Sequence, residues 1–243
     1  MSTAEASAQQ AVTVAERLLD PEQVMAAVPG RPGACLQGLA GTALLHARMS
    51  AVSPVFTAAA RAHWSAAARA ASTARPGIFA APGGLAASLI IGQGYLTDPG
   101  PQLPATAKAV RWLSAKATQA STDWRERLRH GTALPSWALY DVITGLSGTG
   151  RILLAAIEAD HGEAEQGLTA ALDALTTMIA IPRSRTRPGW WLPAAGHPSA
   201  MGVPPSGVAE TGIAHGRAVI SCVKSLAQVG AMFCVKTHEA RWA

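Results

Sequence analysis

Cysteine and aromatic residues are scarce in this chain of 243 residues. It has three cysteines, three phenylalanines and two tyrosines, and aromatic residues make up 5% of the sequence. Three cysteines cannot form a disulfide framework, which favours a reducing compartment. The alternation of apolar and polar residues that marks half-buried strands is almost absent, so we expect no substantial β-sheet.

Long apolar runs are also missing. No stretch reaches the roughly 18 continuous apolar residues of a membrane span, because Gly, Pro and charged residues interrupt every candidate. The opening MSTAEASAQQ contains Glu5 but no Lys or Arg and no apolar core, unlike a secretory signal. We therefore expect a cytoplasmic protein without a transmembrane segment.

Runs of positive charge are absent, although the formal net charge is +5. The arginines are scattered, and Arg125, Arg127 and Arg129 alternate with other residues. This spacing is typical of a solvated surface, so we expect no nucleic-acid partner.

Small apolar residues, Ala above all, are abundant instead, and the composition is 49% hydrophobic and 14% charged. That balance favours close-packed helices. Helical periodicity predicts helices over residues 5–19, 55–71, 105–120, 152–159 and 163–179, and Asp20-Pro21 should end the first. We expect one all-α domain.

A glycine-centred phrase recurs along the chain, each time before an apolar run. The instances are residues 38–41, 84–86, 145–148 and 212–216. This recurrence fits a helical-hairpin repeat in which each phrase opens an inner helix, with glycines allowing a tight turn and close approach. The alternative is that each glycine serves helix packing alone.

Three segments carry a resemblance to a known family. Residues 140–150 (YDVITGLSGTG), 189–193 (GWWLP) and 211–216 (TGIAHG) resemble, in order and spacing, lanthionine synthetase C-like proteins, and residues 36–41 are similar to that family's first repeat. The likeness covers roughly residues 11–216. It implies an α/α toroid, here incomplete with about four hairpin repeats, over residues 1–216, followed by a divergent tail over 217–243.

The resemblance implies a cyclase of lanthipeptide maturation. In that family a cysteine of a precursor peptide adds to dehydroalanine or dehydrobutyrine and forms a thioether ring. The sulfur must become a thiolate, which a zinc ion provides by binding it, and the resulting enolate must be protonated. The partners implied are the precursor peptide and a dehydratase or transporter.

The motif match places His215 and Asp141 on the family's acid/base positions. A histidine titrates near neutrality and can protonate the enolate, while a carboxylate can orient it or carry protons. The structural alternatives are a hydrogen-bonded core histidine and an aspartate that caps a helix. We expect Trp190 and Trp191 to form packing or a cavity wall rather than to catalyse; their rings could also hold a peptide.

After Gly216 the likeness stops. The family's zinc ligands lie in C-terminal repeats that this sequence does not contain, and Cys222, Cys234 and His238 match no standard zinc spacing. We therefore expect no metal ligands and no bound zinc in this chain, with little cyclase activity on its own. An open arc of repeats would also expose apolar helix sides, which predicts self-association.

Two other functions remain open. One is a non-catalytic peptide-binding or scaffold protein of a peptide-modification complex. The other is a different α/α-toroid enzyme, such as a glycosidase or terpene cyclase. That enzyme would need paired carboxylates across the cavity or an Asp-rich motif, and the sequence has neither in helical register.

Overall fold

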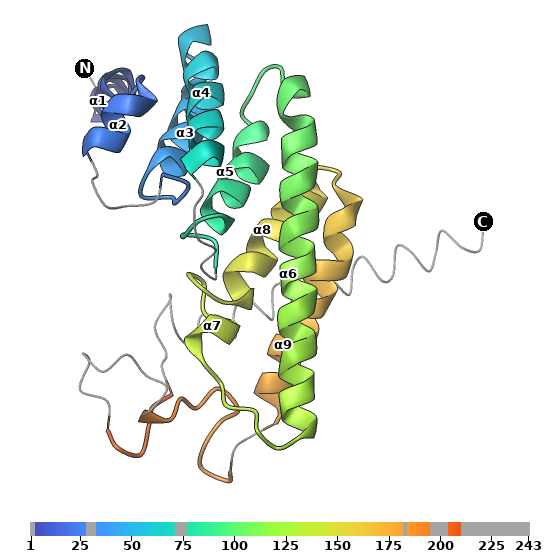
Figure 1. The fold of residues 1–243 in the computed structure, drawn as a ribbon. Helices are drawn as coiled ribbons and strands as arrows, with labels where there is room; N and C mark the ends of the chain where they lie inside the picture. Colours follow the sequence, from blue (N-terminus) through green and yellow to red (C-terminus); the bar gives the residue numbers. More distant parts are fainter. Residues whose placement is uncertain (1–2, 28–32, 71–76, 182–183, 195–203, 210–243) are drawn as a thin grey trace, which may run out of the picture. The chain divides into compact units, whose positions relative to one another are not determined.

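The helices of the chain appear in a computed structural model that describes residues 3–27, 33–70, 77–181, 184–194 and 204–209 (Figure 1). In chain order these helices are α1 (Thr3–Arg17), α2 (Pro21–Ala27), α3 (Leu39–Met49), α4 (Pro54–Ala70), α5 (Gly83–Gln93), α6 (Leu103–Arg129), α7 (Trp137–Tyr140), α8 (Leu146–Glu158) and α9 (Glu165–Ala180), with 3-10 turns at Gly100–Gln102 and Gly162–Ala164.

The all-α prediction is confirmed for these residues. Their β-structure amounts to two isolated bridges, Ser184 with Arg187 and Leu192 with Val208. Over the same part of the chain, no helix has both the length and the apolar character that crossing a membrane requires. The boundary predicted at residue 216 lies outside the described residues.

The first helix ends at Arg17, two residues before the predicted end at residue 19. Asp20 Oδ1 accepts a hydrogen bond of 2.8 Å from the Glu22 N–H, and Pro21 is the first residue of α2. A carboxylate before the first turn and a proline at its start both favour a new helix. The dipeptide therefore begins α2, three residues after the end of α1.

The chain divides into two compact units. One comprises residues 1–113 and 155–162, and the other comprises 114–154 and 163–243. Both α6 and α8 contribute to each unit.

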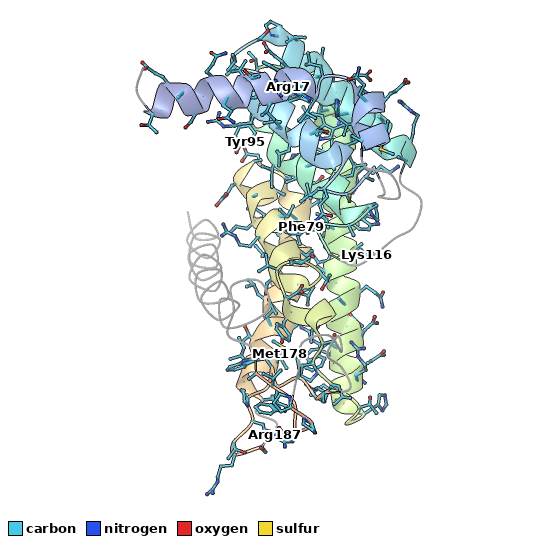
Figure 2. All side chains as sticks on the ribbon, turned by 90° about the vertical axis from the view of Figure 1, so that its left-hand side faces the viewer. Arg17, Phe79, Tyr95, Lys116, Met178 and Arg187 are labelled. Carbon is cyan, nitrogen blue, oxygen red and sulfur yellow. The ribbon has the colours of Figure 1, made fainter. Side chains whose placement is uncertain are left out.

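In the first unit, α3, α4 and α5 pack side by side (Figure 1). The Leu36 N–H before α3 donates to the Phe79 carbonyl before α5 at 2.9 Å, and Ser50 Oγ after α3 donates to the Tyr95 carbonyl after α5 at 2.7 Å. Figure 2 shows Phe79 and Tyr95 at the two ends of α5. The segments before α3 and α5 are hydrogen-bonded to each other, and so are the segments after them, so α3 and α5 run parallel.

Helix α4 runs antiparallel to these two helices. The Trp64 indole N–H on α4 donates to Ser88 Oγ on α5 at 2.8 Å, and this hydroxyl donates to the Ala40 carbonyl on α3 at 2.5 Å. Arg61, earlier in α4, pairs with Asp98, which follows α5. The unit is therefore a succession of helical hairpins with alternating direction.

Helix α5 is enclosed on all sides, and every residue from 83 to 93 is buried or partly buried. A Cβ on Gly84 would lie 2.9 Å from the Phe79 carbonyl oxygen and 3.0 Å from Leu36 N. The glycine thus lets the loops before α3 and α5 meet at the start of α5. The second phrase therefore lies at the start of a buried helix.

In the second unit, α9 packs along the later part of α6. Gly167, near the start of α9, lies against Ser114, and Asp173, further along α9, pairs with Arg125. The second contact lies further along both helices than the first, so α6 and α9 run parallel here. Glycine at position 167 lets the two helices approach closely, because a Cβ there would collide with Ser114.

Candidate functional site

The loop between α7 and α8 holds Asp141, the first of the two predicted acid/base residues. Its side chain is buried, with 1% exposure. Oδ1 accepts hydrogen bonds from the N–H groups of Thr144 (2.5 Å) and Gly145 (2.7 Å) and from the Thr144 hydroxyl (2.9 Å). The carboxylate thus binds donors at the start of α8, where backbone N–H groups lack helical partners.

The first turn of α8 folds back onto the same loop. Ser147 Oγ donates to the Tyr140 carbonyl at 2.5 Å, and the Gly148 N–H donates to the Asp141 carbonyl at 3.4 Å. A Cβ on Gly145 would lie 2.7 Å from the Tyr140 nitrogen. The glycine phrase therefore lets the loop carrying Asp141 pack directly on the helix start.

These three hydrogen bonds hold the Asp141 side chain in one orientation at the start of α8. The bonds also make Asp141 a cap of α8, which is the structural role that the sequence left open for it. Its acid/base role stays a prediction.

The tryptophan segment lies beyond the end of α9. Gly189 packs on the Met178 and Ile181 carbonyls, and the Trp191 indole N–H donates to the Ser206 carbonyl at 3.0 Å. The Arg187 guanidinium stacks over the Trp191 ring at 5.4 Å from its centroid. These contacts give Trp191 a packing role, as predicted, and hold residues 204–209 against the segment.

The second predicted acid/base residue, His215, lies outside the described residues, as do Cys222, Cys234 and His238. Within the described part of the chain, no three His, Cys, Asp or Glu side chains gather in a way that could hold a metal ion.

Sequence reasoning missed two buried histidines, His46 on α3 and His63 on α4. Both side chains are fully buried, their ring centroids lie 4.9 Å apart, and the rings meet edge-on. The available signal was periodicity, since His63 falls on the same helical face as the buried Phe56 and Ala67. A histidine in an apolar register is a candidate for a buried polar contact.

The chain has no match among protein-family models, and no curated protein resembles it significantly.

Proposed function

We propose that this chain forms part of a lanthionine synthetase C-like cyclase, an α/α toroid that closes thioether rings in a precursor peptide. The observation that carries the proposal is that each glycine phrase in the described residues leads into a helix. These are α3, α5 and α8, which begin at Leu39, Gly83 and Leu146. The resemblance expects a repeat unit at these phrases.

The helix directions support the same architecture. Helices that follow glycine phrases run parallel in the first unit (α3 and α5), and α4 between them runs antiparallel. In the second unit α6 and α9 also run parallel. Parallel inner helices joined by antiparallel outer ones are what a ring of helical hairpins requires.

In the proposed reaction the peptide thiolate attacks the β-carbon of dehydroalanine or dehydrobutyrine, and the resulting enolate takes up a proton at its α-carbon. His215 supplies that proton, and Asp141 supplies a fixed negative charge that favours the protonated imidazole. Zinc, which the family uses to bind the thiolate, has no ligand set among the described residues, so the proposal assigns them none.

A second candidate is a peptide-binding scaffold that docks on a dehydratase or transporter. The hydrogen bonds of Asp141 favour this scaffold role, because three of them to Oδ1 account for the buried carboxylate without a catalytic role. In this case the site would hold the precursor peptide and leave ring closure to another protein.

A thiol-addition assay separates the two functions. The full chain, with its zinc content measured by elemental analysis, is incubated with a synthetic peptide that contains one cysteine and one dehydroalanine. Ring closure leaves the peptide mass unchanged but removes the free thiol, so iodoacetamide labelling followed by mass spectrometry measures it. The matched variants are His215→Asn and His130→Asn, the latter at an exposed position in the second unit.

A slow loss of free thiol, in keeping with the low activity expected of this chain on its own, that His215→Asn abolishes and His130→Asn preserves supports the cyclase. Binding of the peptide without loss of thiol, measured by fluorescence anisotropy, supports the scaffold. Neither binding nor thiol loss overturns both proposals.

A further inference from the structure

The histidine pair, His46 and His63, connects three parts of the first unit. His46 Nε2 lies 2.9 Å from the Leu18 carbonyl oxygen, and His63 Nε2 lies 3.1 Å from the Leu19 carbonyl oxygen. Leu18 and Leu19 form the turn between α1 and α2. Residues 3–27, the N-terminal arm, are thus bound through this turn to both α3 and α4.

These contacts fix the tautomer of each neutral ring. A carbonyl oxygen only accepts, so Nε2 carries a hydrogen in each histidine, and Nδ1 of the neutral ring is an acceptor. His63 Nδ1 lies 2.7 Å from Thr42 Oγ1, which can donate to it. His46 Nδ1 is buried and has no hydrogen-bond partner.

A proton added to His46 would therefore create a buried donor without an acceptor. A second proton on His63 would place two positive rings with centroids 4.9 Å apart. Burial lowers the pKa of both histidines, and the charge of His46 lowers that of His63 further. The carbonyl bonds and, for His63, Asp20 act in the opposite direction without reversing the shift.

Apart from Arg61, the other charged side chains on the packed helices are exposed. Arg61 on α4 is partly buried and pairs with Asp98. The exposed ones are Glu5, Glu16 and Arg17 on α1, Glu22 on α2, Arg48 on α3 and Arg69 on α4.

The arm has little else to hold it. The buried side chains of α1 and α2 are Ala15 and Val24. Val24 joins a small apolar cluster with Leu39 and Ala67, to which Leu18 and Met25 add partly buried contacts. The two histidine bonds therefore add to a small apolar contact.

We propose that His46 and His63 form a pH-sensitive switch, in which the neutral pair docks the N-terminal arm on α3 and α4 and protonation releases it, uncovering Leu39 and Ala67. The released arm lets both rings bind protons, whereas the docked arm excludes them. Docking is therefore strongest above the ordinary histidine pKa of 6.5 and weakens as the pH falls from there towards the lowered values.

Hydrogen exchange of the full chain at pH 7.5 and 5.5, corrected for intrinsic rates, tests this switch. One unit below pKa 6.5 each excluded proton weakens docking by up to about tenfold, so two weaken it by up to about a hundredfold. Peptides from residues 3–27 should lose protection by that factor, while peptides from α9 keep theirs.

The variant H46Q/H63Q is the test of cause, because each glutamine offers an Nε2 donor to the carbonyl but does not titrate. Its arm should show the same protection at both pH values. His130→Gln, at an exposed position, should respond as the unaltered chain does. Three results would each overturn the proposal. They are equal protection of the arm at both pH values in the unaltered chain, a loss of protection in α9 equal to that in the arm, and a loss in the arm of H46Q/H63Q as large as in the unaltered chain.

A measurement on the unaltered chain covers the case in which the double variant does not fold. Imidazole ¹⁵N NMR should find two neutral Nε2–H rings at pH 7.5 whose protonation coincides with the loss of arm protection. Protonation of both rings while the arm stays protected contradicts the switch.

Discussion

Replacing Asp141 should lower the free energy of unfolding by an amount that grows with the number of hydrogen-bond donors left without an acceptor. In Asp141→Ala, the N–H groups of Thr144 and Gly145 and the Thr144 hydroxyl lose Oδ1. Each N–H left unsatisfied costs about 1–3 kcal/mol, and the hydroxyl, in a partly buried residue, can turn to water. For the two N–H groups we expect a loss of about 2–6 kcal/mol in the free energy of unfolding.

Asp141→Asn retains Oδ1 as an acceptor and should lose less than about 1 kcal/mol, because the loss is then that of the charge-assisted part of the bonds. Asp123→Ala is the matched control on α6, since Asp123 is exposed and accepts a hydrogen bond from the side chain of Gln119, which is also exposed. It should change stability by less than about 0.5 kcal/mol.

Thermal unfolding followed by circular dichroism at 222 nm measures all three variants. For a chain of this size each kcal/mol corresponds to about 2–4 °C in Tm. A Tm of Asp141→Ala equal to that of Asp123→Ala would refute the capping role. Equal losses in the Ala and Asn variants would show that the charge, and not the acceptor geometry, stabilises the loop.

Three further changes test the packing. Gly145→Ala should cost about 1–3 kcal/mol, because its Cβ would meet the Tyr140 backbone at 2.7 Å; urea unfolding measures it, and no loss would contradict the close approach. Ser88→Ala should cost about 1–3 kcal/mol and alter the Trp64 environment, since the buried indole N–H loses its acceptor. If Ser88→Ala left the fluorescence spectrum and the urea midpoint unchanged, the hydrogen bonds from Trp64 to Ser88 and from Ser88 to Ala40 would be refuted. Arg125→Gln should change stability by less than about 1 kcal/mol, because its ion pair is solvent-exposed; a larger loss by the same assay would show that the pair is more than a surface contact.

Local patterns predicted much of the helical content but set several boundaries wrongly. Residues 105–120 were expected to be helical, whereas α6 runs from Leu103 to Arg129. The buried Ser121 and Trp124 continue its packed face through a polar stretch. The predicted helix at 152–159 begins earlier, at Leu146, because the small residues of the glycine phrase are buried and can join the helix.

The candidate site was only partly predictable. Asp141 was identified from its motif, and its burial and hydrogen bonds follow from the helix start that comes after it. The histidine pair was not, because His46 and His63 belong to different helices and their shared partners, Leu18 and Leu19, belong to a third segment. No local pattern specifies such a contact.

By itself, the sequence determined the helical class, the break at Asp20-Pro21 and the glycine phrases before α3, α5 and α8, since these depend on periodicity and backbone freedom within a few residues. Only the tertiary structure decided which helices run parallel and which carbonyls the buried histidines bind. Those outcomes depend on side chains far apart in the chain meeting in space, where burial and unsatisfied hydrogen bonds select one arrangement.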